Sequence, residues 1–194
     1  MSKLVLASAS PRRRELLARL GLPFTIQPSR IDESVYRHLP PAARVEALAL
    51  AKARAVAAGL TDALVLGADT LVVCEGRVLG KPDSPAAAAR MLAFLSGRTH
   101  TVYTGVAVVQ APRGPEGVTH ARTAVTFRHL TPDQIEAYVA TGEPLDKAGA
   151  YGIQGRGALL VAGIEGDYFN VVGLPLVQVE ELLAIFGVDV WGRV

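Results

Sequence analysis

Cysteine is nearly absent from this 194-residue sequence, and its apolar runs are short. The single cysteine, Cys74, cannot form a disulfide within the chain, which favours a reducing compartment. No segment approaches about 18 consecutive apolar residues, the length that a membrane helix needs. The apolar stretch before Ser8 is too short for a signal peptide. We therefore expect a soluble, cytoplasmic protein that does not bind a membrane.

Motifs of several enzyme classes are missing as well. The four histidines are scattered without metal-ligand spacing, and there is neither a GxSxG nucleophile elbow nor a GxGxxG dinucleotide fingerprint. The GRVLGKP segment is not a Walker A loop, because only three residues separate Gly76 from Gly80 and Pro82 follows the lysine. These absences argue against a covalent enzyme intermediate.

The composition is that of a folded chain with a sizeable core. Half of the residues are hydrophobic and a fifth are charged, and we expect a single domain over residues 1–194. The formal net charge of +2 is too small to indicate a nucleic-acid partner. Only four of the 20 basic residues are lysines, and three of these, Lys52, Lys81 and Lys147, lie in segments that other features single out.

Residues 4–13, LVLASASPRR, combine a short apolar run, a turn of small residues and the start of a helix. Ser10 is a good N-cap, Pro11 suits the first helical position and Gly21 suits the C-cap. The helix start offers unpaired backbone N–H groups and the positive end of the dipole, which favour an anion. Further donors come from Ser8, Ser10, Arg12 and Arg13. The alternative is an ordinary capped helix whose arginines are solvated.

Apolar periodicity predicts alternating helices and strands along the rest of the chain. We expect helices over 11–20, 41–58, 85–95, 132–141 and 176–186. We expect strands over 24–27, 63–68, 71–74, 99–110, 118–130 and 158–164. The segment 144–157 is too rich in glycine and alanine for a regular helix, so we expect its backbone to pass close to a ligand or to another strand.

Two charged residues interrupt apolar patterns. Lys52 shares a helix face with Val45 and Leu48, so it either extends along the surface toward water or reaches an anion in a cleft. Asp69 follows the buried run 63–68, where a carboxylate costs free energy unless it is paired or bound to a metal. Asp69 is therefore the best candidate for a reacting carboxylate.

Further candidates lie in the turns that follow. Lys81 is either a phosphate ligand or a turn lysine. Asp146 and Lys147 bring opposite charges to the start of the glycine-rich segment, and Gln154 within it offers both an amide donor and a carbonyl acceptor.

Several strings occur together in one order, and together they resemble the Maf family of nucleoside triphosphate pyrophosphatases over nearly the whole chain. They are SASPRR at 8–13, the pair Asp32–Glu33, EALALAKA around Lys52, GADT at 67–70, GKP at 80–82, DKAGAYGIQG at 146–155 and VVGLPL at 171–176. The resemblance implies an α/β fold of the inosine triphosphatase-like kind, with an elongated mixed sheet flanked by helices and two lobes around a cleft. It also implies a cytoplasmic homodimer that requires a divalent metal cation, which we take to be Mg²⁺.

The resemblance assigns roles residue by residue. It makes Asp69 the proton acceptor. We take Glu33 and Asp69 as the candidate metal ligands. The phosphate-binding residues that it implies are Ser8, Arg13, Lys52 and Lys81. Arg12, Thr70 and Gln154 match the branch that acts on dTTP and UTP, whereas a branch acting on 7-methyl-GTP has a bulky aromatic residue, glutamine and glutamate at those positions.

The expected reaction is attack of water on the α-phosphorus of dTTP, UTP or a modified pyrimidine nucleotide, giving the monophosphate and pyrophosphate. The alternative is a non-catalytic nucleotide-binding regulator of septum formation. A binding module needs the basic residues but no reactive carboxylate, so Asp69 favours the enzyme.

Overall fold

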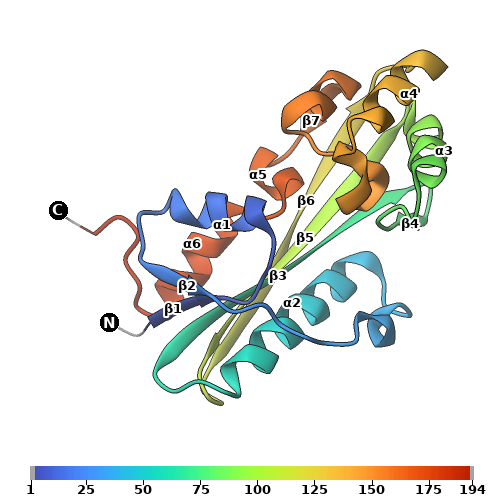
Figure 1. Ribbon diagram of the computed structural model, residues 1–194. Coiled ribbons are helices and arrows are strands. Elements are labelled where there is room, and N and C mark those ends of the chain that lie inside the picture. The colour runs from blue at the N-terminus through green and yellow to red at the C-terminus, as the bar shows by residue number, and fades with distance from the viewer. Residues whose placement is uncertain (1–2, 193–194) are drawn as a thin grey trace. The chain divides into compact units, whose positions relative to one another are not determined.

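The computed structural model, drawn in Figure 1, describes residues 3–192. The strands in that range are β1 (Lys3–Leu6), β2 (Phe24–Ile26), β3 (Ala63–Cys74), β4 (Arg77–Leu79), β5 (Thr99–Gln110), β6 (Glu116–Phe127) and β7 (Val161–Glu165). The α-helices are α1 (Pro11–Ala18), α2 (Pro41–Ala57), α3 (Pro85–Leu95), α4 (Pro132–Ala140), α5 (Tyr168–Val172) and α6 (Leu176–Ile185). Short 3₁₀ helices are η1 (Glu33–Tyr36), η2 (Glu143–Asp146), η3 (Ala148–Ala150) and η4 (Gly155–Leu160).

The described strands form one mixed sheet of seven. Their order is β2-β1-β3-β5-β6-β7, and β4 pairs with β3. Strand β1 pairs in parallel with β2 and β3, whereas β4 is antiparallel to β3 and β7 is antiparallel to β6. Helices flank this sheet (Figure 1), so the expected α/β class with a mixed sheet is confirmed.

The chain divides into two compact units. Unit 1 contains the described residues up to Asp69, together with Thr104–Ala121 and the described residues from Gly173 onward. Unit 2 contains Thr70–Tyr103 and Arg122–Val172. The long strands β3, β5 and β6 contribute residues to both units.

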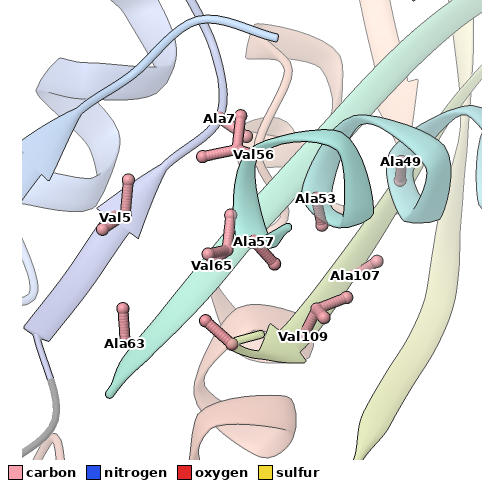
Figure 2. Packing of buried hydrophobic residues seen from close by; sticks show 11 residues of the cluster. Val5, Ala7, Ala49, Ala53, Val56, Ala57, Ala63, Val65, Ala107 and Val109 are labelled. Atoms are coloured by element: carbon pink, nitrogen blue, oxygen red, sulfur yellow. The ribbon is translucent and has the colours of Figure 1, made fainter. Parts of the chain in front are cut away.

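The core of unit 1 is built from small apolar side chains of α2 and of the sheet, as Figure 2 shows. Ala49, Ala53 and Ala57 of α2 are fully buried, and Val65 and Ala107 of the sheet belong to the same cluster. Because alanine has only a methyl side chain, alanine at three successive turns lets the backbone of α2 lie close to the strands that it packs against.

Unit 2 has an aromatic core around a buried histidine. His100, Phe127 and Tyr151 meet edge to face, with ring centroids 4.8 to 5.3 Å apart. The Nε2 atom of His100 lies 2.7 Å from the hydroxyl oxygen of Tyr151. This geometry is the favourable one for aromatic pairs, and it gives the buried tyrosine hydroxyl a partner.

The structure departs from the sequence-based expectations at a few boundaries. Strand β3 runs through Asp69 and Thr70 without a break, whereas two separate strands were expected. Strand β6 starts at Glu116, two residues before the expected start, and ends at Phe127. It ends there because the Arg128 backbone N–H donates to the Leu160 carbonyl oxygen, and the Arg128 carbonyl oxygen accepts from the Gly97 N–H. Residues 158–160 form the end of η4 and not strand, and α5 was not expected.

The described helices are of ordinary globular length. None of those within residues 3–192 combines the length and the apolar character needed to cross a membrane.

Candidate functional site

A lysine and two carboxylates meet in unit 1. The Lys52 ammonium on α2 lies 2.6 Å from Oδ1 of Asp69 on β3 and 2.7 Å from Oε1 of Glu33 in η1. The side chains of Lys52 and Asp69 are only 12% and 10% exposed, whereas that of Glu33 is 55% exposed. Lys52 therefore turns inward to a buried carboxylate and does not extend along the surface. The charged group interrupting the strand is paired, as the cost of burying it requires.

A glycine makes this pairing possible. If position 67 carried a Cβ atom, that atom would lie 2.2 Å from the carbonyl oxygen of Ala49 on α2. Gly67 and Asp69 share one face of β3 because side chains alternate along a strand. Ala49 and Lys52 are three residues apart, so they share one face of the helix. The close approach at Gly67 thus places Lys52 over Asp69.

The third member of the cluster is positioned by its neighbour in the sequence. Asp32 is the N-cap of η1, and its carboxylate accepts a hydrogen bond from the Ser34 backbone N–H at 2.9 Å. Hydrogen bonds from Ser34 lower the pKa of Asp32. This cap fixes the short helix whose first residue, Glu33, contacts Lys52. Asp32 therefore caps the short helix, whereas Glu33 pairs with Lys52.

Arg13 connects helix α1 by hydrogen bonds to the backbone next to Asp69. Its Nε and Nη1 atoms donate to the carbonyl oxygens of Gly173 and Ala68, both at 2.8 Å, and Nη1 lies 3.5 Å from the Ser8 hydroxyl. Ala68 directly precedes Asp69, so the guanidinium holds the backbone beside the Asp69 carboxylate. Burial lowers the pKa of Arg13, and the charge of Asp69 opposes this shift. Arginine stays protonated in such surroundings, so it adds a fixed positive charge.

The start of α1 has the predicted form. The Ser10 side chain caps the helix by accepting from the Arg13 N–H at 3.4 Å, and Ser8 accepts from the Ser10 N–H at 3.2 Å. Ser8 is buried, whereas Arg12 is partly exposed. The predicted anion donors Ser8, Arg12 and Arg13 therefore gather at one helix end.

The other predicted residues lie in unit 2. Thr70 follows Asp69 on β3, and its side chain points to the opposite face of that strand. Lys81 is exposed in a turn whose Gly80 carbonyl accepts from the Gly149 N–H at 3.1 Å. Lys147 contacts Asp146 at 2.6 Å and the Glu143 carbonyl oxygen at 2.6 Å. Gln154, which directly precedes η4, is partly buried, and its side chain does not cap that helix.

The donor set fits a magnesium ion that also binds a nucleotide. Within residues 3–192 no group of three or more histidine, cysteine, aspartate and glutamate side chains is placed to hold a metal. Mg²⁺ does not need one, because it usually takes one or two carboxylates plus phosphate oxygens and water. Glu33 and Asp69 provide two carboxylates that already meet at one cation, the Lys52 ammonium.

Sequence reasoning missed two residues that shape these sites. Gly67 was read only as part of a motif, although its missing side chain sets the position of α2. Glu143 was not singled out at all, although its carboxylate accepts from the backbone N–H groups of Arg156 and Gly157. No pattern in the sequence could pair Glu143 with residues 13 and 14 positions away.

Comparison with known proteins identifies the family. The Maf family model, described as "Maf-like protein", matches residues 3–186, and the chain belongs to this family. It is 53% identical to a dTTP/UTP pyrophosphatase of Symbiobacterium thermophilum, covering 98% of this chain and 97% of that protein. It is 54% identical to a dTTP/UTP pyrophosphatase of Pelotomaculum thermopropionicum, covering 98% of this chain and all of that protein.

A solved structure shares the fold. A HAM1 protein from Coxiella burnetii superposes with a TM-score of 0.51 at 17% identity, covering 95% of this chain and 100% of that one. At that identity the likeness supports the fold alone.

Proposed function

We propose that this protein hydrolyses dTTP and UTP to the monophosphate and pyrophosphate. The observation that carries the proposal is the buried Asp69–Lys52 pair with Glu33 beside it, in a chain more than half identical to two proteins named dTTP/UTP pyrophosphatase. In this pair the carboxylate can serve as a base and the cation can bind an anionic substrate.

Asp69 acts as the general base. It accepts a proton from the water that attacks the α-phosphorus, and the bond between the α-phosphorus and the bridging oxygen breaks to release pyrophosphate. Its low exposure keeps bulk water from competing for the carboxylate, and Arg13 holds the backbone of the preceding residue.

The basic residues neutralise the triphosphate. Arg13 supplies a fixed charge, and Lys52 exchanges a carboxylate contact for a phosphate oxygen when nucleotide binds. Ser8 and Lys81 complete the phosphate-binding set that the family resemblance implies. When bound, Mg²⁺ would be held by Glu33 and Asp69 and would supply additional charge neutralisation on the phosphate oxygens.

The base is selected by hydrogen bonds. The Gln154 amide matches the N3–H and a carbonyl oxygen of uracil or thymine, and Arg12 donates to a carbonyl oxygen. Thr70 is the third residue that this branch of the family implies. Modified pyrimidine triphosphates with the same edge belong to the expected substrate class.

A product assay tests the proposal. The protein is incubated with ordinary and modified nucleoside triphosphates and Mg²⁺, and the products are separated by ion-exchange chromatography. Monophosphate with pyrophosphate is the expected result, and removal of the metal with EDTA stops the reaction. Diphosphate with orthophosphate, or nucleotide binding without turnover, overturns it, and the second outcome would favour the non-catalytic regulator.

We also propose that the chain works as a homodimer in the cytoplasm. The family resemblance supports both statements, and the single buried Cys74 agrees with a reducing compartment. Analytical ultracentrifugation and cell fractionation test them.

A further inference from the structure

Glu143 lies at the centre of a hydrogen-bond network in unit 2. Its Oε2 atom accepts from the backbone N–H of Arg156 at 3.2 Å, and its Oε1 atom accepts from the backbone N–H of Gly157 at 3.2 Å. The Tyr138 hydroxyl donates to the same Oε1 atom at 2.9 Å. One side chain in η2 therefore satisfies two backbone donors of the turn that follows Gln154.

Tyr138 extends this network to the other side of Gln154. Its hydroxyl oxygen accepts from the Gly152 backbone N–H at 3.2 Å while its proton is donated to Glu143. Burial raises the pKa of Tyr138, so the hydroxyl stays protonated and remains a donor. The backbone is thus held two residues before Gln154 and again two and three residues after it.

The packing of this turn leaves no space for a side chain at Gly157. A Cβ atom at Gly157 would lie 2.0 Å from the Gly152 carbonyl oxygen and 2.7 Å from the Tyr138 hydroxyl oxygen. The two ends of the Gly152–Gly157 segment therefore touch each other through backbone atoms. The hydrogen bonds of Glu143 and Tyr138 hold these two ends of the loop together.

We propose that Glu143 is a positioning residue that fixes the Gly152–Gly157 loop and so presents the Gln154 amide to the base of the nucleotide. The inference rests on the proposed function in one respect, because only a nucleotide substrate gives the Gln154 amide a base to read. It adds a residue that contacts neither phosphate nor base and acts through the backbone around Gln154.

A carboxylate is required at position 143 for a chemical reason. Both of its oxygens accept, and their partners described above are all donors: two backbone N–H groups and a hydroxyl. The amide in Glu143→Gln keeps one accepting oxygen and turns an NH₂ group toward an N–H donor. At least one of the loop contacts is then lost, although the side chain keeps its size.

Amide hydrogen exchange followed by NMR tests the structural half of the proposal without any nucleotide. In Glu143→Gln we expect at least one of the Arg156 and Gly157 amides to exchange about tenfold faster than in the wild type. In Tyr138→Phe we expect the same change at Gly152. The control is Glu136→Gln, which changes an exposed glutamate on α4 and leaves these amides unaffected. Unchanged exchange at all three amides in both variants overturns the proposal.

Steady-state kinetics with UTP and CTP test the functional half. We expect Glu143→Gln to raise the KM for UTP about tenfold with a smaller change in kcat, and to reduce the preference for UTP over CTP. A general loss of folded protein would lower both rates equally, so a reduced UTP-to-CTP ratio separates positioning from simple destabilisation. Tyr138→Phe provides the second variant if Glu143→Gln folds poorly.

The outcomes distinguish the two proposals. Wild-type protein that releases no pyrophosphate overturns the proposed function, whatever the exchange rates are. Wild-type protein that releases pyrophosphate, together with an unchanged UTP-to-CTP ratio in Glu143→Gln and Tyr138→Phe, overturns only the role given to Glu143.

Discussion

Gly67 of β3 and Ala49 of α2 are in contact through their backbones, because the glycine has no side chain to separate them. This contact sets the distance between the helix and the strand. It therefore also sets the distance between Lys52, one turn further along the helix, and Asp69, two residues further along the strand.

Adding a single methyl group at this contact should disturb both stability and activity. Gly67→Ala places a Cβ atom 2.2 Å from the Ala49 carbonyl oxygen, so α2 must move. We expect the free energy of unfolding to fall by about 1 to 3 kcal/mol, the usual cost of overpacking. Urea denaturation measures this. Gly59→Ala is the matched control, since its nearest neighbour would be 3.9 Å away. Equal stability of the two variants would contradict the prediction.

Removing the charge of Asp69 should affect the chemical step more than binding. In Asp69→Asn we expect kcat to fall by about 10² to 10⁴, because the amide keeps the shape but cannot accept the proton. Nucleotide binding, measured by isothermal titration calorimetry, should change little. Near-normal turnover would assign the base to another group, with Glu33 next. A fall in melting temperature with normal turnover per folded molecule would make Asp69 a structural residue.

Lys52 should matter far more than a lysine outside the cluster. We expect Lys52→Ala to reduce kcat/KM for UTP and to weaken the thermal stabilisation that UTP provides, because Lys52 is the cation in contact with Asp69 and Glu33. Lys3→Ala, at the exposed start of β1, is the control. Lys81→Ala should behave like Lys52→Ala. Equal effects of Lys52→Ala and Lys3→Ala would contradict the assignment.

Local sequence signals predicted what local forces determine. Ser10 caps its helix as expected, and Ser84 and Thr131 also cap helices, with a capping box at Thr131 and Gln134. The 3.6-residue period placed Lys52 on the buried face of its helix, and the buried run before Asp69 indicated a carboxylate in need of a partner. The structure at these residues could be predicted because it depends on neighbours only a few positions away in the sequence.

Contacts between distant segments were not predictable in the same way. Lys52 is 17 residues away from Asp69, and Gly173 is 160 residues away from Arg13, so no sequence period could reveal these contacts. The apolar character of residues 158–160 predicts strand, yet they end η4, whose residues Arg156 and Gly157 donate backbone hydrogen bonds to Glu143. Tertiary hydrogen bonds overrode local propensity there.

The buried histidine predicts a loss of stability in mild acid. Burial lowers the pKa of His100 to about 4, whereas the unfolded chain has an ordinary value of about 6.5. Between these values the unfolded state binds a proton that the folded state does not, so the free energy of unfolding falls as the pH falls from 6.5 to 4. The contribution of His100 is about 3 kcal/mol in total.

Denaturation at pH 7 and pH 4.5 measures this contribution. In His100→Gln the amide can still meet the Tyr151 hydroxyl but cannot titrate, so the difference between the two pH values should be smaller than in the wild type. The same pH dependence in both proteins would show that His100 is not the responsible group.

Substitution of Gln154 should change which base is preferred. If Arg12, Thr70 and Gln154 read a pyrimidine edge, dTTP and UTP are the best ordinary substrates, and CTP is worse because its N3 is an acceptor and its 4-position a donor. Each buried group left unpaired by the wrong base costs about 1 to 3 kcal/mol. Gln154→Glu replaces the amide donor with an acceptor, so we expect it to reduce the preference for dTTP and UTP. Competition assays with dTTP, UTP, CTP and 7-methyl-GTP measure this ranking. A wild-type protein that hydrolyses 7-methyl-GTP faster than UTP, or an unchanged ranking in Gln154→Glu, would overturn the pyrimidine assignment and leave the pyrophosphatase chemistry intact.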